Sequence, residues 1–468
     1  MKSNAQSPNR PSSKPKAQAA ETPSQQSSAG RNPALISFFC VGYGVFLGLC
    51  LLKFPNPPIF EQWTTTPQNG YEMLFSAWPI SWAYAGLALV TIAGLFVVRW
   101  PATPRAGWLI ASLLAWWGWQ VVATVRSVDD ALSTATLKHL TAVVICFFLG
   151  FCSLSRVKNL WPFWIGIFFA LLLVIWTAWN QHFGGLKESR EYFLMYVYPK
   201  LHNVPPEYLK KIMTERVFGT FFYPNTLAGG ILLLLPPTLA LLWNTDRFTP
   251  PARLFLIAAV SLGCFGCLFW SGSKGGWLLM LFLGVVVLLR TPISIKQKVG
   301  LILAVVVIGC GAFFARHLLF FRKGATSVSA RFDYWQAAVK IIKEHPATGT
   351  GPGTFFIPYQ AVKKPESEPA RLVHNDYLEQ GTDAGVPALL LYAAFAIGSL
   401  VITARYTEIR TDWVVFTVWV GLLGFFVQEF IEFSLYIPTM AWPAFTFLGW
   451  LLGNAKQIKQ VEFPTIPA

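Results

Sequence analysis

The residues of this chain that best suit acid–base chemistry lie in the segment His374-Asn375-Asp376-Tyr377. Further polar side chains follow within a few positions, among them Glu379 and Asp383. Because an imidazole titrates near neutral pH, His374 could take a proton from a hydroxyl group, with Asn375 beside it. The same residues could also form only the polar cap of a helix. The pattern alone leaves both interpretations open.

Three cations occur in aromatic or glycine-rich surroundings that could hold an anion. Arg216 precedes Val-Phe-Gly-Thr, Lys274 lies in Ser-Gly-Ser-Lys-Gly-Gly, and Arg331 opens an amphipathic stretch. A cation on a glycine-rich turn at a helix N-terminus suits phosphate. Taken singly, each cation is better explained by contact with lipid headgroups. Together they make an anion site worth testing.

Two other patterns carry less information. The segment Gly349-Thr-Gly-Pro-Gly-Thr lacks the Lys-Ser/Thr of a phosphate-binding P-loop, so it indicates a helix stop and turn, or a backbone nest for an anion. Asp129-Asp130 could hold a divalent cation, but a helix cap is the better interpretation. We therefore predict no metal and no cofactor.

The composition indicates which elements must position these residues. Of the 468 residues, 54% are apolar and 13% are charged, about half the roughly 25% of soluble domains. Apolar runs of the length that a bilayer core of about 30 Å requires recur along the chain. We predict an all-α polytopic membrane protein with about twelve transmembrane helices, at about 34–52, 78–98, 107–124, 140–154, 160–178, 225–243, 252–270, 274–290, 299–316, 386–404, 412–429 and 436–453.

The basic residues predict the orientation of these spans. Residues 1–32 are polar and are expected to form a disordered cytoplasmic tail, and 454–468 a cytoplasmic C-terminal tail. With residues 33–453 alternating across the membrane, most Lys and Arg of the short loops fall on the side of the tails. The short loops of the other side carry four cations, namely Lys53, Arg126, Lys138 and Lys274. Both termini should therefore be cytoplasmic.

Two long loops, at about 179–224 and 317–385, lie on the outer side in this topology. Loops of this length usually serve a function. The second contains a predicted helix from about Ala330 to Glu344, in which four apolar residues recur at helical spacing: Phe332, Trp335, Val339 and Ile342. We expect this helix to lie along the membrane surface or to cap the bundle.

Several of these segments resemble one family when they are taken in order. The stretch from Arg331-Phe-Asp-Tyr-Trp through His345-Pro and the glycine-rich turn to His374-Asn375 resembles the signature loop of the O-antigen ligase and polymerase family. Gly219-Thr-Phe-Phe-Tyr-Pro-Asn-Thr-Leu-Ala, Ser273-Lys-Gly-Gly and Glu432-Phe-Ser-Leu-Tyr-Ile-Pro are similar to its other elements. The resemblance covers about 210–453.

The resemblance implies a glycosyltransferase of the bacterial inner membrane. Such enzymes take a glycan from undecaprenyl diphosphate on the periplasmic face. A ligase passes it to a hydroxyl of lipid A-core or a similar acceptor, in lipopolysaccharide biosynthesis, and a polymerase passes it to another carrier-linked repeat of the polysaccharide. We favour the ligase, because the single large loop before the tenth span is more typical of that branch.

The family's functional residues map onto five positions here. His374 and Arg331 match its catalytic loop residues, and Lys274 stands where the family usually has Arg, which keeps the charge but not the bidentate fork. Arg216 and Asn375 are assigned to substrate binding. The implied partners are the undecaprenyl diphosphate-linked glycan, a glycolipid or glycan acceptor and membrane lipids, without nucleic acid. The carrier supplies the leaving group, so the enzyme should be independent of metal.

Transport is the alternative from another functional class. A transporter places charged or broken helices near mid-membrane. The predicted spans hold almost no charge, and the polar groups gather at one outer face. A vesicle flux assay beside a glycan-transfer assay distinguishes the two.

Overall fold

The regular structure of the chain is entirely helical in the part that the computed structural model describes. These residues are 33–101, 107–204, 209, 212–221, 223–322, 326–365 and 367–454. No strand occurs among them, which confirms the predicted all-α fold. The predicted tail at 1–32 and positions 455–468 of the C-terminal tail lie outside the described residues.

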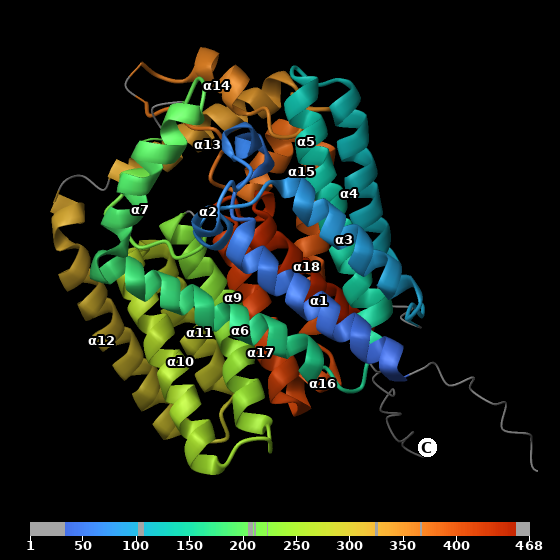
Figure 1. Cartoon of the computed structure of the whole chain (residues 1–468), viewed down its shortest axis with the longest axis vertical. Helices are drawn as coiled ribbons and strands as arrows, with labels where there is room; N and C mark the ends of the chain where they lie inside the picture. The colour runs from blue at the N-terminus through green and yellow to red at the C-terminus, as the bar shows by residue number, and fades with distance from the viewer. Residues whose placement is uncertain are drawn as a thin grey trace, which may run out of the picture.

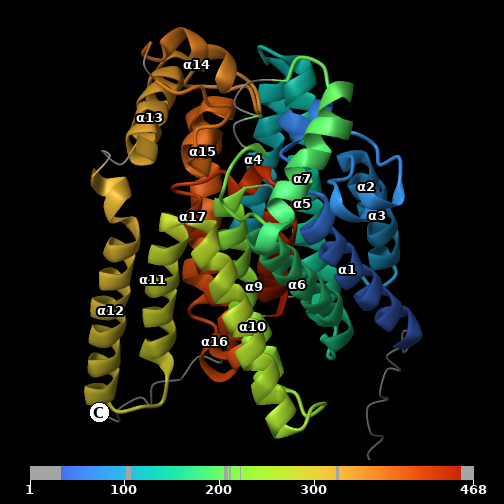
Figure 2. The same cartoon turned by 60° about the vertical axis from the view of Figure 1, so that its left-hand side comes forward.

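The helices form one upright bundle with shorter helices at one end (Figures 1 and 2). The first half of the chain contributes α1 (Pro33–Lys53), α2 (Gly70–Phe75), α3 (Ile80–Leu95), α4 (Gly107–Val125), α5 (Asp130–Phe148), α6 (Trp161–Asn180) and α7 (Leu186–Tyr192). The second half contributes α9 (Pro224–Asn244), α10 (Pro250–Ser271), α11 (Lys274–Arg290), α12 (Ile295–Arg322), α13 (Thr326–Glu344), α14 (Phe356–Val362), α15 (Asp376–Thr403), α16 (Thr407–Thr411), α17 (Trp413–Gln428) and α18 (Pro438–Asn454).

Each predicted span coincides with a helix. Among the described residues, eight helices are long and apolar enough to cross a membrane, and α3 and α17 are apolar but shorter. The polytopic helical architecture is therefore confirmed, whereas the number twelve stays a prediction. The two largest boundary differences concern the fourth and tenth spans, because α5 begins at Asp130 instead of 140 and α15 at Asp376 instead of 386. Lys138, predicted to lie in an outer connection, is therefore inside a helix.

The centre of the bundle is α18, in which every residue from Pro438 to Gly453 is buried. It packs against α1, α5 and α17. Close helix contacts depend on glycine, as in many membrane bundles. A Cβ on Gly44 of α1 would lie 2.0 Å from the carbonyl oxygen of Phe163 in α6, so only glycine allows these two helices to approach.

The amphipathic helix of the second long loop, α13, caps one end of the bundle together with α14 (Figure 2). Its buried face differs from the predicted stripe. Ala338 and Ile341 pack in a small apolar cluster with Tyr359 of α14, whereas Phe332 and Val339 of the predicted stripe are exposed. The predicted stripe is thus divided, because Trp335 and Ile342 are half-buried while Phe332 and Val339 face outward.

Helix α15 is interrupted where the predicted tenth span begins. Ala384 and Gly385 leave the helical conformation, and Gly385 has φ of 76°. A Cβ there would lie 2.4 Å from the carbonyl oxygen of Ala347, so the close approach requires glycine. Trp119 of α4 donates through Nε1 to the carbonyls of Ala347 and Ala384 at 3.1 and 2.9 Å. The break separates a polar outer segment, residues 376–383, from the apolar remainder.

Candidate active site

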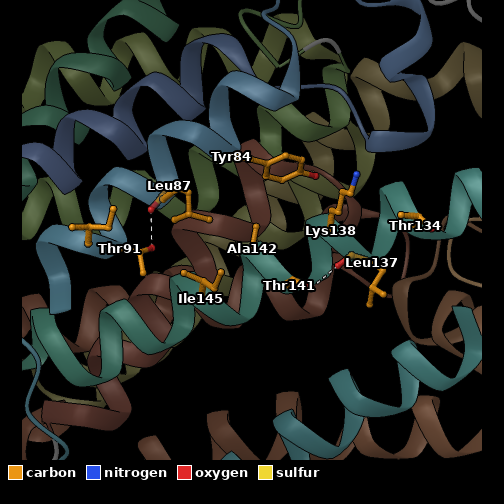
Figure 3. A pocket seen from close by; sticks show the side chains of 11 residues that line it. Tyr84, Leu87, Thr91, Thr134, Leu137, Lys138, Thr141, Ala142 and Ile145 are labelled. Atoms are coloured by element: carbon orange, nitrogen blue, oxygen red, sulfur yellow. Dashed lines mark hydrogen bonds between the residues drawn. The ribbon is translucent and has the colours of Figure 1, made fainter.

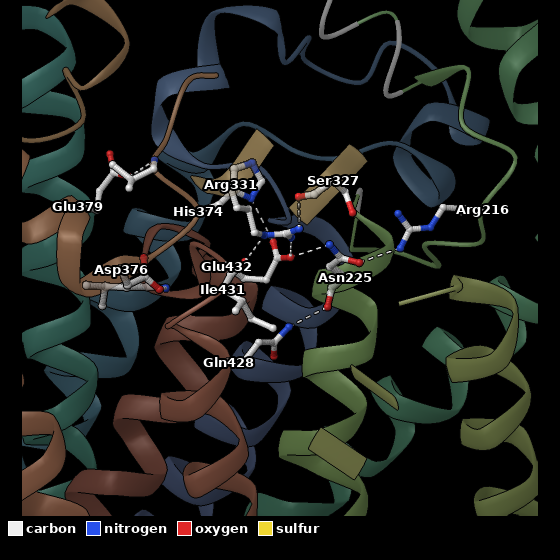
Figure 4. A network of polar contacts seen from close by, with 12 residues as sticks. Arg216, Asn225, Ser327, Arg331, His374, Asp376, Glu379, Gln428, Ile431 and Glu432 are labelled. Atoms are coloured by element: carbon white, nitrogen blue, oxygen red, sulfur yellow. Dashed lines mark hydrogen bonds and ion pairs between the residues drawn. The ribbon is translucent and has the colours of Figure 1, made fainter. Parts of the chain in front are cut away.

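The predicted site residues converge on a carboxylate, Glu432, in the segment between α17 and α18 (Figure 4). Its side chain is 10% exposed and its oxygens face groups from three other parts of the chain. Arg331 of α13 and Asn225 of α9 both donate to Oε1, at 2.5 and 2.6 Å. Nδ1 of His374 lies 3.4 Å from Oε2. One acid therefore connects the candidate base with the candidate loop cation.

Arg331 is held by backbone as well as by this ion pair. Its Nε donates to the carbonyl of Ile431 at 2.9 Å, and a terminal nitrogen donates to the carbonyl of Ser327, one turn earlier in α13, at 3.1 Å. These bonds fix the plane of the guanidinium, which a lysine could not reproduce. The contact with Ile431 also ties α13 to the segment that carries Glu432.

Arg216 joins the same network through Asn225. Its terminal nitrogen donates to Asn225 Oδ1 at 2.7 Å, and its Nε donates to the carbonyl of Ser271 at 2.6 Å. Asn225 is in the first turn of α9, which starts with Pro224, a residue suited to that position. Gln428 of α17 bonds the carbonyl of Asn225 at 3.0 Å. The arginine, the amide and the carboxylate thus form one chain of hydrogen bonds.

Glu432 remains ionised in this environment. Burial would raise the pKa of its carboxyl group, but the Arg331 charge, together with His374 and Asn225, lowers that pKa to about 2. The pKa of Arg216 is lowered from its usual value, chiefly by burial. The carboxylate therefore carries its charge at any physiological pH, and it can orient a neutral imidazole or stabilise a charged one.

His374 has an unusual backbone conformation, with φ of 56°. A non-glycine residue in the left-handed region costs about 1–2 kcal/mol, so surrounding contacts must hold it there. The N–H of the preceding Val373 donates to the Glu379 carboxylate. The imidazole lies between two aromatic rings, 4.7 Å from Phe433 and 5.8 Å from Tyr334, measured between ring centroids.

Lys274 begins α11 after Ser273, whose side chain caps the helix by accepting from the N–H of Gly276. It lies within electrostatic range of Arg216 and Arg331 and of a further cation, Arg316 of α12. Arg316 is also 5.1 Å from the ring of Phe269 at the outer end of α10. Lys274 therefore lies in a group of four cations, two of which, Arg331 and Arg216, also interact with Glu432, and the region has an excess of positive charge.

The polar residues that follow His374 in sequence form a second, interior cluster. Asp376, Glu379 and Asp383 are fully buried on the first turns of α15. They accept hydrogen bonds from two other segments: Asp376 from the N–H of Leu435 and Asp383 from the hydroxyl of the adjacent Tyr436, and Glu379 from the N–H of Val373. The segments that present Glu432 and His374 are thus attached to α15.

Asn375, the glycine-rich loop and Asp129, which were also singled out in the sequence, make hydrogen bonds that stabilise the fold. Asn375 caps α15 by accepting from the N–H of Leu378 at 3.0 Å, and its amide donates to the carbonyl of Phe430. In the glycine-rich loop, the N–H groups of Thr350 and Gly351 donate to carbonyls of α15, so these two are not available to an anion. Asp129 caps α5, as predicted.

Three members of the network were not assigned a role from the sequence. Glu432 and Asn225 were noted only as parts of two motifs, and Arg316 was counted as the end of a span. Sequence separation explains these omissions, since Asn225 and Glu432 are 207 positions apart. A charged residue at the outer end of an apolar run was the one available signal for Arg316.

This arrangement combines an anion-binding surface with a proton acceptor. Excess positive charge can stabilise negative charge that develops on a leaving group. With Nδ1 of His374 directed at Glu432, the other ring nitrogen carries the lone pair in the corresponding neutral tautomer. A hydroxyl group could deliver its proton there while the anion rests on the cations.

Comparison with known families agrees with this picture. No curated protein matches the chain significantly. The model of the O-antigen ligase family matches residues 256–393, a region that includes Lys274, Arg331 and His374, whereas Arg216 and Glu432 lie outside it. This match confirms the resemblance indicated by the sequence motifs: residues 256–393 of this polytopic helical protein are similar to the O-antigen ligase family.

Proposed function

We propose that the protein transfers a glycan from undecaprenyl diphosphate to an acceptor hydroxyl at the periplasmic face of the bacterial inner membrane. The observation that carries this proposal is the meeting of Arg331 and His374 at a single carboxylate, Glu432. The excess of cations around it suits a diphosphate, and the paired imidazole suits a hydroxyl nucleophile.

The cations act on the donor in this proposal. As the bond between sugar and diphosphate breaks, negative charge grows on the leaving diphosphate. Arg331, Arg216, Lys274 and Arg316 converge near this position, so they stabilise the charge without a cofactor. Activity should therefore survive EDTA; a chelator-sensitive activity that Mg²⁺ or Mn²⁺ restores would contradict this part of the proposal.

His374 acts on the acceptor. Glu432 orients the imidazole through Nδ1, and the opposite nitrogen takes the hydroxyl proton as the oxygen attacks the sugar carbon. The left-handed backbone at His374 and the aromatic rings on either side hold the base in place. Asn375 positions the start of α15 and has no chemical step of its own.

Within this proposal we favour a ligase with lipid A-core or a similar glycolipid as acceptor, and a polymerase is the alternative. Deletion of the gene distinguishes them. A ligase predicts loss of surface glycan with long carrier-linked chains accumulating. Accumulation of single repeat units instead would identify a polymerase and refute the ligase assignment.

The cation assignment is tested by transfer assays on reconstituted protein. Lys274→Ala should slow transfer without lowering the protein level, whereas Lys274→Arg should retain the rate, because charge is the property used. Arg316→Ala should also slow transfer. Wild-type turnover in the Ala variants of Arg216, Lys274 and Arg331 would refute the anion site.

A further inference from the structure

A groove of about 630 Å³ lies between α3 and α5, and none of its lining residues belongs to the candidate active site (Figure 3). On α3 it is lined at helical spacing by Tyr84, Leu87 and Thr91, and on α5 by Lys138, Thr141 and Ile145. One continuous face of each helix therefore contributes a wall, and both helices belong to predicted membrane spans.

The walls of the groove are apolar in chemical terms, although threonines contribute to them. Thr91 donates its hydroxyl to the carbonyl of Leu87 at 2.7 Å, one turn earlier in the same helix. Thr141 does the same with Leu137 at 2.8 Å. Because these hydroxyls already donate to their own helices, the threonines offer mainly methyl groups to an occupant.

Two polar groups depart from this apolar lining. Lys138 lies eight residues into α5, about 12 Å along the axis from the start of the helix at the rise of 1.5 Å per residue. A lysine exposed to hydrocarbon at the middle of a span costs about 2.5–3.5 kcal/mol, unless it reaches the interface or an anion. Across the groove, the hydroxyl of Tyr84 is buried and has no hydrogen-bond partner among the described residues.

We propose that this groove binds one anionic diacyl phospholipid from the leaflet on the side of the long loops. The phosphate pairs with the ammonium group of Lys138, which is exposed on α5. One acyl chain lies along the apolar wall as far as Ile92 and Ile145. From Tyr84 to Ile92 this wall is eight residues, about 12 Å, which fits within one leaflet of a core of about 30 Å.

Charge complementarity favours a phospholipid over the diphosphate carrier. The groove offers one cation, Lys138, which balances the single phosphate of a phospholipid. The candidate active site gathers four cations, a set suited to a diphosphate. The two surfaces share no residue, so the lipid site and the proposed transfer reaction can fail independently.

Native mass spectrometry of the full chain tests the proposal, with phosphatidylglycerol and phosphatidylcholine added separately. The wild type should retain phosphatidylglycerol preferentially, by about fivefold if Lys138 contributes about 1 kcal/mol. Lys138→Met should abolish this preference. The matched control is Lys187→Met, because Lys187 is an exposed lysine on α7 that pairs with Glu191, outside the groove.

A second variant tests the contribution of the groove to lipid binding separately from that of the Lys138 charge. Ala88→Trp fills the groove from an exposed position on α3, leaves Lys138 in place, and should lower retention of phosphatidylglycerol. The proposal is wrong if Lys138→Met keeps the headgroup preference, if Lys187→Met loses it equally, or if Ala88→Trp retains the lipid as well as the wild type does.

Discussion

Two polar clusters adjoin the start of α15, and they differ in almost every physical respect. The outer cluster, Arg331, His374, Asn225 and Glu432, contains the ion pair of Arg331 with Glu432, and the His374 side chain is 26% exposed. The interior cluster on α15, Asp376, Glu379 and Asp383, is fully buried, and its donors are backbone N–H groups and a tyrosine hydroxyl. The outer cluster has the properties of a reaction site, and the interior one those of a scaffold.

The difference shows that one helix, α15, can both position the reactive side chains and anchor the neighbouring segments. His374 and Asn375 immediately precede α15, so the reactive ring stands at its start, where backbone geometry is set by a cap. In the following turns, the carboxyl groups of Asp376 and Glu379 accept hydrogen bonds from the backbone N–H groups of Leu435 and Val373. Substitutions should therefore affect turnover in the outer cluster and folding stability in the interior one.

The largest effect is expected from His374→Asn. Asparagine tolerates the left-handed conformation, so this variant removes the base and keeps the backbone. Transfer should fall by about 10²–10⁴-fold, the usual contribution of general base catalysis. Transfer rates and Tm are measured together, and near wild-type turnover in a folded variant would remove His374 from the mechanism.

Arg331→Ala should come next, with a loss of about 10²–10³ in transfer rate, comparable with removal of one electrostatic donor from other active sites. Arg331→Lys should fall between this variant and the wild type. It keeps the charge but cannot reproduce the bonds to Ile431 and Ser327 together with the ion pair. A wild-type transfer rate in Arg331→Lys would show that the geometry of the guanidinium contributes nothing, and a rate equal to that of Arg331→Ala would show that charge alone contributes nothing.

Low pH should lower the stability that the outer cluster contributes, because the Glu432 carboxylate becomes protonated. The pKa of its carboxyl is about 2 in the folded protein and 4.5 ordinarily, so its stabilising contribution is complete above about 4.5 and is lost as pH falls toward 2. The difference corresponds to about 3 kcal/mol. Thermal unfolding across this range should show a steeper acid loss in the wild type than in Glu432→Gln, and parallel curves would contradict the assignment.

The smallest effects on turnover are expected from substitutions in the interior cluster, which should lower stability instead. Asp376→Ala leaves the N–H of Leu435 buried without its acceptor, which costs about 1–3 kcal/mol of stability. Asp376→Asn keeps an accepting oxygen and should be close to wild type. Turnover per folded molecule should change little in either variant, whereas a hundredfold loss in Asp376→Asn at normal Tm would give the interior carboxyl a chemical role.

The fold was largely predictable because membrane spans are encoded locally, in runs of apolar residues. Each expected span coincides with a helix, and errors fell where polar residues continue a helix beyond the apolar run, as in α5 from Asp130. The buried face of α13 was missed because Ala338 and Tyr334 are not prominent in a hydrophobic pattern.

The candidate site was predictable only in part. His374, Arg331, Lys274 and Arg216 were identified from the sequence. The structure places the first two against Glu432, Arg216 beside them through Asn225, and Lys274 within electrostatic range of both arginines. The identity of that carboxylate was not predictable, because Glu432 meets Arg331 from 101 positions away. Local sequence patterns indicate which reactive side chains are available. Which of them come into contact is determined only by the packing of α9, α13 and α17.

The central claim, that His374 and Glu432 act as one unit, is tested most directly by a double-mutant cycle. Single-turnover transfer is measured for the wild type, His374→Asn, Glu432→Gln and the double variant, with donor saturating. Because Glu432 acts on the acceptor through the imidazole, the loss in the double variant should fall well short of the product of the two single losses, and any loss beyond that of His374→Asn should come from the broken pair with Arg331. Losses that multiply would show that the two residues act independently and would contradict the proposed mechanism.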